Sequence, residues 1–478
     1  MGGMEKTNEK IKKIARDFVS RTVEFYGELG KKPFFTPSGR AAEERLGKQE
    51  IPEEGRDLSE VYEEMLGDVY SHVLFSQHPR AFSCVPSTAS LISWMGDVMT
   101  NAFNPHAACK VNAPAADLVE RKLVRWMADL AGYPGTAGGI FVSGGSVANL
   151  TALTAARDAR LTGEERAKAV VYVSDQTHSS VAKGLLVIGF FPEQIRKIPC
   201  DALFRMDVSR LNAEIEADLA AGRKPFAVVG SAGTTNTGSV DPLGEISSVC
   251  KKYGMWFHVD GAYGATALLS GRGKERLRGI ELSDSLSWDA HKWMLQTYGC
   301  SLVLVRDRAD LVRSFAAHPE YLRDAETSED GVEFWDLGPE LTRPARSLKL
   351  WFTLQVLGSR EFGRIVDHGC ALSELAEKTV RARDGWEVVS PASLAVVNFR
   401  FAPEGLTEEE RDEVNCRASK EITESGFAQV YTTELCGRKV LRLCTIHPET
   451  TEEDVLETVA RLAKYASAAA EDVLRSRR

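Results

Sequence analysis

The feature that most constrains the fold of this chain is a regular alternation of short apolar runs and amphipathic stretches between residues 139 and 259. Runs of strand length lie at 139–142, 169–173, 194–198, 226–231 and 256–259, helical spacing fills 146–160, 178–188, 208–221 and 242–253, and further strands are expected near 283–287 and 300–305. This pattern predicts an α/β fold with a large, mixed, mostly parallel seven-stranded sheet covered by helices on both faces. Ligands of such sheets bind at the carboxyl ends of the strands, so functional residues are expected in those loops.

Two smaller units are expected around this sheet. Residues 1–90 predict an N-terminal helical arm, which buries little of its own surface and should pack on the main domain or on a second subunit. The large domain is expected over 91–356. Residues 357–478 predict a small α+β domain with helices at 360–382, 407–424 and 451–475 and strands at 395–402, 428–432 and 439–444.

Composition excludes several classes of protein. The net charge of −9 and the pI near 5.7 argue against a nucleic-acid partner, which would need a basic patch. Nine widely spaced cysteines without a CxxC pair are typical of reduced thiols, so we expect a cytoplasmic protein without a zinc or other metal site. No secretory signal is visible, and the longest apolar run, 184–191, is far short of the ~20 residues that a membrane span needs.

One lysine and one carboxylate in the strand-end loops suggest pyridoxal 5′-phosphate (PLP). Lys292 follows His291 at the end of an apolar run, and Asp260 ends the strand expected at 256–259. PLP needs an amine that holds it as an imine and a carboxylate that keeps its pyridine nitrogen protonated. We expect His258, two residues before Asp260, to point to the opposite face of the strand, which disfavours a shared metal site.

The segment Ser143-Gly144-Gly145-Ser146-Val147-Ala148-Asn149 joins a strand to a helix and predicts a phosphate cup. Free main-chain N–H groups, a hydroxyl and the helix dipole converge at such a point. Two other interpretations stay open, a glycine-rich turn kept for its geometry and the nucleophile elbow of a serine hydrolase. The elbow requires G-x-S-x-G, and Ala148 occupies the place of its last glycine.

Two more loops carry polar groups to the same edge. His178, at the start of a helix, could stack on a planar ring or simply cap the helix. Thr235, in Gly233-Thr234-Thr235-Asn236-Thr237-Gly238, lies in a loop that could equally be an ordinary polar turn. Because these features follow successive strands in order, they favour a cofactor site together more than each does alone.

Taken in order, Gly-Gly-Ser-Val-Ala-Asn, His178-Ser-Ser, Gly-Thr-Thr, His-Val-Asp260-Gly-Ala-Tyr and His291-Lys292-Trp resemble the group II PLP-dependent amino-acid decarboxylases, the family of the aromatic-amino-acid and glutamate decarboxylases. The resemblance covers nearly the whole chain and looks closest to the tryptophan decarboxylases of gut anaerobic bacteria. It implies the PLP-dependent transferase fold of type I and a homodimer with active sites at its interface.

The resemblance also implies roles for single residues. Lys292 would be the Schiff-base lysine, His178 would stack on the cofactor ring, and Asp260 would pair with the pyridine nitrogen. The residues around the cofactor would further include Gly145, Ser146, Thr235, Ala262, Asp289 and His291. Asp289 departs from the asparagine of many animal relatives, and a carboxylate repels a phosphate. Tyr321, in a segment that resembles the mobile catalytic loop, would protonate the substrate carbon after carbon dioxide leaves.

The side-chain pocket would, by the same resemblance, be lined partly across a dimer interface by Phe82, Cys84, Val85, Pro86, His106, Trp335 and Leu341. Its apolar character favours an aromatic substrate over glutamate, which would need a cation. Cys84 stands where an aromatic residue is expected, so the pocket would be roomier. Tryptophan, giving tryptamine, is the first choice, and phenylalanine, tyrosine or a broad aromatic range are the alternatives.

Three other functions stay open. The same fold serves PLP-dependent aminotransferases and carbon–sulfur lyases. A serine hydrolase could use Ser146, Asp260 and His291, although this leaves Lys292 unexplained. A binding module without catalysis would leave all these reactive residues without a task.

Overall fold

A seven-stranded sheet forms the centre of the protein. The computed structural model describes residues 2–36, 39–83, 85, 88–317 and 331–477. The strand order is β1-β7-β6-β5-β4-β2-β3, and β7 alone among the described strands of this sheet runs antiparallel to its neighbours. The bounds are β1 Gly138–Val142, β2 Ala169–Ser174, β3 Ile195–Ile198, β4 Lys224–Ser231, β5 Trp256–Asp260, β6 Ser285–Asp289 and β7 Ser301–Val305. The mixed, mostly parallel sheet of the sequence prediction is confirmed.

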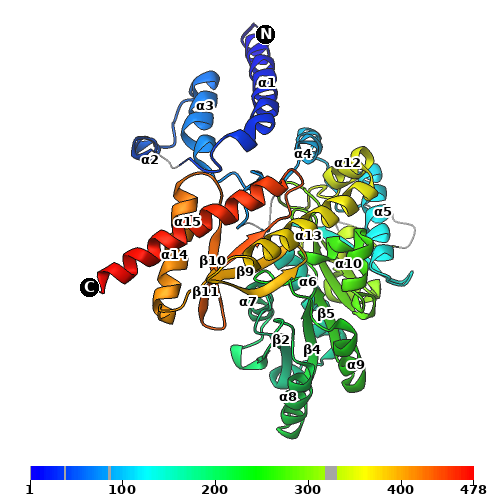
Figure 1. Ribbon diagram of the computed structural model, residues 1–478. Coiled ribbons are helices and arrows are strands. Elements are labelled where there is room, and N and C mark those ends of the chain that lie inside the picture. The colour runs from blue at the N-terminus through cyan, green and yellow to red at the C-terminus, as the bar shows by residue number, and fades with distance from the viewer. Residues whose placement is uncertain (1, 37–38, 84, 86–87, 318–330, 478) are drawn as a thin grey trace.

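Helices cover both faces of this sheet (Figure 1). On one face the buried core contains side chains of α5 Pro114–Leu130, α8 Val208–Ala220, α9 Leu243–Tyr253, α12 Leu348–Leu357 and α13 Ser359–Arg381. On the other face it contains side chains of α6 Gly145–Arg160, α7 Ser179–Val187 and α11 Arg308–Phe315. Strands buried on both faces must be apolar along their whole length, which explains the continuous apolar runs of the sequence.

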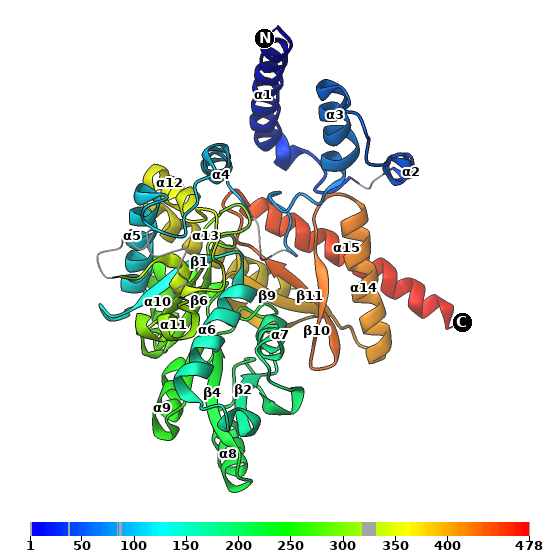
Figure 2. The same ribbon diagram turned by 180° about the vertical axis from the view of Figure 1, so that it is seen from behind.

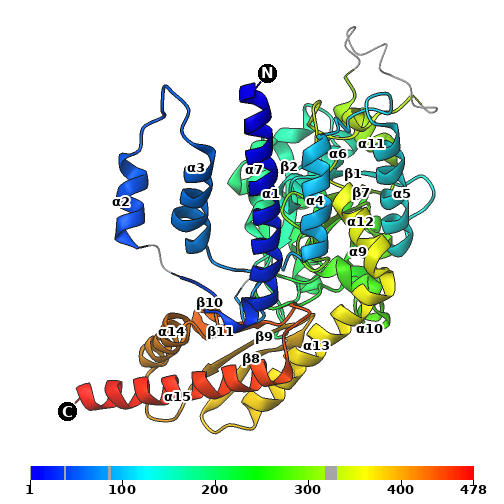
Figure 3. The ribbon, with the colours of Figure 1, turned by 90° about the horizontal axis from the view of Figure 1, so that it is seen from above.

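The N-terminal segment contains a long helix, α1 Gly2–Glu28, and two short ones, α2 Arg40–Lys48 and α3 Leu58–Glu64. Seen from above, α1 lies beside α4 Leu91–Phe103, whereas α2 and α3 stand apart from the body of the molecule (Figure 3). The rings of Phe18 and Trp94 join α1 to α4, with centroids 6.1 Å apart. Gly96 lets α4 approach α12 closely, because a Cβ there would lie 3.0 Å from Lys349 Cα.

The C-terminal part forms a second, antiparallel sheet of four strands in the order β10-β11-β9-β8. Figure 2 shows β9, β11 and β10 next to the helices of this part. Its bounds are β8 Trp386–Ser393, β9 Val396–Phe401, β10 Tyr431–Leu435 and β11 Arg438–Cys444, and its helices are α14 Glu408–Glu424 and α15 Glu452–Ser476. Residues of α13, α14 and α15 share one core with these strands. The domain limits at 90 and 356 stay a prediction.

Two details differ from the sequence-based expectation. β8 is missing from it, because β8 is an edge strand that contains Pro391 and has half-buried side chains, so its pattern does not stand out. The expected strand at 428–432 lies three residues later, as β10. No helix in the described part of the chain is long and apolar enough to cross a membrane.

Candidate active site

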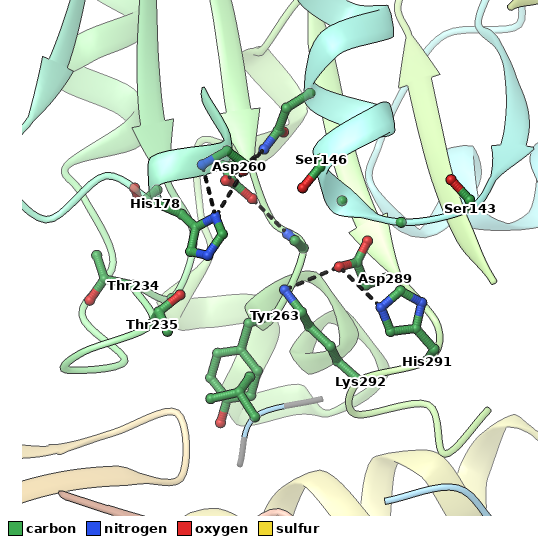
Figure 4. A pocket seen from close by; sticks show the side chains of 18 of the residues that line it. Ser143, Ser146, His178, Thr234, Thr235, Asp260, Tyr263, Asp289, His291 and Lys292 are labelled. Carbon is green, nitrogen blue, oxygen red and sulfur yellow. Dashed lines mark hydrogen bonds and ion pairs between the residues drawn. The ribbon is translucent and has the colours of Figure 1, made fainter. Parts of the chain in front are cut away.

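A pocket of about 370 Å³ opens at the carboxyl ends of the central strands. Residues from the ends of β1, β2, β4, β5 and β6 line it, so the loops after five strands converge there. All nine residues expected around the cofactor are among its lining: Gly145, Ser146, His178, Thr235, Asp260, Ala262, Asp289, His291 and Lys292. In Figure 4, His178 and Asp260 lie on one side of Lys292, and Asp289 and His291 on the other.

The first turn of α6 forms one end of the pocket. Its N-cap residue, Gly144, has no side chain that could cap the helix. The main-chain N–H of Val147 already donates to the Gly144 carbonyl, which leaves the N–H groups of Gly145 and Ser146 to face an anion. Gly145 is needed for space: a Cβ there would lie 2.7 Å from Asp289 Oδ2 and 3.2 Å from Ala262 Cβ. The cup between α6 and Asp289 therefore has room only for glycine at this position.

Lys292 faces the carboxylate of Asp289, with 3.1 Å between Nζ and Oδ2. The same oxygen lies 3.7 Å from His291 Nε2, and the other, Oδ1, is buried without a hydrogen-bond partner among the described residues. Burial and the nearby charge of Lys292 lower the pKa of His291, although Asp289 opposes the shift. A carboxylate with one unsatisfied buried oxygen is costly, and its pairing with Lys292 offsets part of this cost.

Buried contacts with α4 and α12 hold the turn that carries Lys292 in place. Leu295 adopts a left-handed conformation with φ of 59°, which costs a non-glycine residue about 1 kcal/mol. Gln296, fully buried, accepts from Ser93 Oγ in α4 and from Thr353 Oγ1 in α12. Lys349 Nζ donates to the carbonyl oxygen of Tyr298 at 2.7 Å. Packing from two helices thus compensates the strain and fixes the base of the Lys292 side chain.

Asp260 ends β5 and is 8% exposed. Its Oδ1 accepts from the Ala262 amide at 3.1 Å and from Ser287 Oγ at 3.1 Å, and its Oδ2 accepts from Asn149 Nδ2 at 3.0 Å. Burial alone would raise the pKa of Asp260, but the positive charge of Lys292 and these hydrogen bonds hold it below its ordinary value. Asp260 is therefore an ionised carboxylate inside the pocket.

His178 is the N-cap of α7. Its Nδ1 accepts from the main-chain N–H of Ser180 at 3.2 Å and lies 2.8 Å from Ser180 Oγ. The capping role and the pocket role that the sequence left open therefore coexist. Thr235, in the loop after β4, lines the pocket beside Thr234 (Figure 4).

The expectation for His258 is wrong. His258 and Asp260 point to the same face of β5, because side chains two residues apart on a strand share a face, and both contact Asn149. Asn149 and Ser180 also line the pocket but were not singled out from the sequence. Asn149 stands four residues after Gly145, which places it on the same face of α6, and this spacing could have identified it.

The residues expected in the substrate pocket are more scattered. Val85 lines the pocket, whereas Phe82 is buried in the core beneath the four-stranded sheet. His106, Trp335 and Leu341 do not line it. His106 forms an isolated bridge with Pro344, the Trp335 amide donates to the Ala108 carbonyl, and Leu341 is 47% exposed. Three further candidates, Cys84, Pro86 and Tyr321, lie outside the described residues.

Comparison with known proteins decides the family. The model of the pyridoxal-dependent decarboxylase conserved domain matches residues 41–402. The chain belongs to the pyridoxal-dependent decarboxylase family. It is 38% identical over 460 residues to an aromatic-L-amino-acid decarboxylase of Bacillus atrophaeus, covering 96% of both chains, and 30% identical over 459 residues to tyrosine decarboxylase 2 of Narcissus pseudonarcissus, covering 94% and 92%. A crystal structure of Oryza sativa TDC with PLP and tryptamine superimposes with a TM-score of 0.90 at 28% identity, covering 96% and 98%.

Membership of this decarboxylase family makes the chain a PLP-dependent amino-acid decarboxylase of fold type I. The pocket fits the cofactor on its own terms, since it holds an amine on Lys292, an ionised carboxylate on Asp260, an imidazole on His178 and free amides at the start of α6. Asp289 is the one group that does not suit a phosphate, and Lys292 faces it.

The hydrolase alternative finds no support in the decarboxylase pocket. The Asp260 carboxylate is bonded to Ala262, Ser287 and Asn149, and the Nδ1 atom of His291 lies 3.2 Å from Ser301 Oγ. None of the described hydrogen bonds joins Ser146, His291 and Asp260 into a triad.

Proposed function

We propose that this decarboxylase acts on an aromatic L-amino acid, with L-tryptophan, which would yield tryptamine and CO₂, as the first choice. The observation that carries the proposal is the charge of the pocket: among its described lining residues Lys292 is the only lysine or arginine. Arg442, nearby, already donates to the main-chain oxygens of Thr235 and Ser83. An acidic substrate side chain would lack a cation, whereas Val85 and Tyr298 offer apolar and aromatic surface.

We assign the cofactor-binding roles from this geometry and the family resemblance. Lys292 would hold the cofactor covalently, and the first turn of α6, with Gly145 and Ser146, would bind its phosphate. Asp260 would keep the pyridine nitrogen protonated, and His178 would stack on the ring. When bound, PLP supplies a ring that takes up the electron pair released as the bond between Cα and the carboxylate breaks.

Side chains of this protein would then control where a proton is added after CO₂ leaves. Asp260, ionised and held by three hydrogen-bond donors, keeps positive charge at the pyridine nitrogen favourable. Tyr321 is our candidate for the acid that delivers a proton to the substrate Cα, which completes decarboxylation. Delivery of the proton to the cofactor instead of the substrate Cα would divert the reaction to transamination.

We also propose a homodimer with the active sites at its interface. Exposed apolar side chains gather on neighbouring helices, with Phe18 and Val19 on α1 and Met95, Val98 and Met99 on α4 each between 38% and 48% exposed. Such a surface is typical of a subunit contact. His106, Trp335 and Leu341 would then serve the partner's pocket, which explains why they lie away from this one.

We further propose that the domain boundaries lie at residues 90 and 356 and that the protein is cytoplasmic.

Competition between substrates tests the proposal most directly. Purified holoenzyme is given tryptophan, phenylalanine, tyrosine and glutamate at equal concentrations, and the amines are quantified. We expect tryptamine to dominate, with kcat/KM for glutamate at least about 100-fold below that for tryptophan, because a buried carboxylate without a cation is strongly disfavoured. Preferred turnover of glutamate would overturn the aromatic assignment.

The reaction type has its own measurement. Tryptamine and CO₂ in equal amounts support decarboxylation, whereas indolepyruvate as the main product would indicate an aminotransferase. Borohydride reduction should fix the cofactor on the peptide that contains Lys292, and Lys292→Ala should abolish turnover. Label on another lysine, or full activity of Lys292→Ala, would refute the assignment.

A further inference from the structure

Asn149 lies at the centre of a buried hydrogen-bond chain that extends beyond its bond to Asp260. It is fully buried, and its Nδ2 lies 3.0 Å from Asp260 Oδ2 and 3.1 Å from Ser180 Oγ. Its Oδ1 lies 3.0 Å from His258 Nε2. One side-chain amide therefore contacts the carboxylate beneath the pocket, the serine next to His178, and a buried histidine on the same strand as Asp260.

The direction of every hydrogen bond in this chain is fixed by chemistry. An ionised Asp260 only accepts, so the amide nitrogen of Asn149 must face it, and Asn149 Oδ1 must accept from His258 Nε2–H. His258 Nδ1 then accepts from Ser285 Oγ, at 2.8 Å, and that hydroxyl oxygen accepts from Trp256 Nε1. A flipped Asn149 would place an oxygen against the Asp260 carboxylate.

The chain continues from Asn149 to His178. Ser180 Oγ accepts from Asn149 and donates to His178 Nδ1, which also accepts from the Ser180 amide. The remaining N–H of a neutral His178 is then on Nε2, the ring nitrogen without a role in this chain. Asp260 and His178, which come from different strand ends, are thus connected through the side chains of Asn149 and Ser180.

Burial keeps the chain in one protonation state. Desolvation lowers the pKa of His258 to about 4, so this histidine is neutral near pH 7 and has a single N–H to donate. The titratable groups that face the chain are Asp260 and His258 from β5, His178 from the start of α7, and Lys292 with Asp289 after β6.

We propose that Asn149 is a positioning residue that orients the Asp260 carboxylate and the His178–Ser180 pair together, so that one amide sets the position of two groups of the cofactor pocket. The inference rests on the proposed pairing of Asp260 with the pyridine nitrogen. It goes beyond that pairing by assigning its geometry to a residue of α6, four residues after Gly145.

Replacement by an apolar side chain of similar size gives the first test. Asn149→Leu removes all the hydrogen bonds of the amide and leaves Asp260 Oδ2 without this donor. We expect the apoenzyme to bind PLP about tenfold more weakly or worse, because a hydrogen bond to a charged group is lost, and kcat to fall more than KM rises. PLP affinity is read from cofactor absorbance during titration of apoenzyme.

Thr151→Val is the matched control. Thr151 is equally buried in the same helix, but its hydroxyl has no hydrogen-bond partner among the described residues. We expect its PLP affinity to stay within about twofold of the wild type. Equal PLP affinity of Asn149→Leu and wild type would overturn the proposal.

Asn149→Asp gives a second, independent test. Its pH-dependent effect on PLP affinity would not be expected if Asn149 only stabilised the fold, and it can be measured even if Asn149→Leu fails to fold. The introduced carboxyl matches the amide in shape, and its single O–H can replace the donor to Asp260, but not the donor to Ser180, when it is protonated. Two touching carboxylates cannot both ionise, so this replacement is lost as the pH rises. We expect PLP affinity near the wild-type value at pH 6 and a gap to wild type that widens about tenfold by pH 8.5. A gap that is constant with pH would contradict the inference.

A third variant separates this inference from the function it rests on. If Asp260→Asn binds PLP and turns over like wild type, the role of Asp260 is wrong, whatever Asn149 does. If Asp260→Asn loses the cofactor and Asn149→Leu keeps it, only the inference about Asn149 fails.

Discussion

The two carboxylates of the pocket, Asp260 and Asp289, differ in how their oxygens are hydrogen-bonded. Asp260 has a hydrogen-bond donor on each oxygen and a pKa below its ordinary value, held there against burial by Lys292 and its donors. Asp289 has Lys292 on one oxygen and none of the described residues on the other. The first is built to stay charged, whereas the second lies where the resemblance places a phosphate.

This difference predicts a gain of function at residue 289. Asp289→Asn removes a negative charge from the phosphate cup and releases Lys292 from its ion pair, and both changes favour the cofactor. We expect about tenfold tighter PLP binding, measured by titrating the apoenzyme at pH 7.5. Asp175→Asn, at the end of β2 and outside the pocket lining, is the control. Weaker binding by Asp289→Asn would mean that the carboxylate itself assists the cofactor.

Single residues also show how much of the site could be predicted from the sequence. Lys292, Asp260, His178 and the glycine cup could be predicted because each follows a strand, and the ends of parallel strands meet. Asn149 could not be recognised by type, since one buried amide in a helix resembles any other until its partners are known. Phe82, His106, Trp335 and Leu341 do not line the pocket, and the sequence did not show this, because a sequence does not reveal which segments pack against one another.

At the scale of secondary-structure elements, a buried ion pair joins the helices behind the site. Arg343, just before α12, donates to both oxygens of Glu120 in α5, and the two side chains are at most 1% exposed. Arg343 also donates to the carbonyl oxygens of Ala107 and Phe141, so β1 and the loop after α4 are joined to the same pair. The strand that leads into the phosphate cup is therefore fixed by this pair.

We predict that breaking this pair destabilises the fold without touching the pocket. Arg343→Met leaves the Glu120 charge buried and unpaired, so the free energy of unfolding should fall by about 3 to 5 kcal/mol. The double variant with Glu120→Leu should recover part of the loss, because no unpaired charge remains. Urea unfolding of the apoenzyme measures both, and additive losses in the double variant would contradict the explanation.

Element prediction succeeded where burial is uniform. The strands of the large sheet are apolar throughout and appear directly in the sequence, and α13, α14 and α15 begin within a residue of their expected starts. β8 could not be recognised because an edge strand with a proline and half-buried side chains lacks both periodicities. The short helices of the N-terminal segment, such as α2, have few buried residues to set a pattern.

On the scale of the whole molecule, buried histidines make stability depend on pH. Burial lowers the pKa of His78, His258 and His447 to about 4 each, against an ordinary value of 6.5. As pH falls below 6.5 the unfolded chain takes up protons that the folded chain refuses, so stability is lost. Asp241 acts in the opposite sense, because burial raises its pKa to about 6 and the folded chain takes up one proton there.

The net effect should be a clear acid sensitivity. We expect the free energy of unfolding of the apoenzyme to fall by roughly 2 to 4 kcal/mol between pH 6.5 and pH 5, as three histidines outweigh one aspartate. His447→Gln should reduce this loss by about two fifths, because one of three histidine contributions disappears while the opposing one of Asp241 stays. Unfolding in urea across this pH range provides the measurement, and a flat profile would show that these histidines are accessible to protons.

The apolar surface of α1 and α4 gives a prediction for assembly. The 52.5 kDa chain should elute from size-exclusion chromatography with light scattering at twice its mass. The double variant Met95→Glu/Met99→Glu places charges on that surface and should shift the enzyme to monomer with loss of activity, since the proposed site is shared. Leu456→Glu, a comparably exposed apolar position on α15, should leave the dimer intact. An active monomer would exclude a shared site.

The antiparallel course of β7 has one more consequence. The segment that carries Lys292 starts at Asp289 and returns at Ser301, and these two residues are paired across β6 and β7, while Ser301 is also paired with Val142 at the entrance of the phosphate cup. The amine of Lys292 and the phosphate cup are thus both attached to β1, β6 and β7, which are joined by main-chain hydrogen bonds that need no cofactor. The apoenzyme should therefore keep this arrangement of β1, β6 and β7 and take up PLP without rebuilding the site.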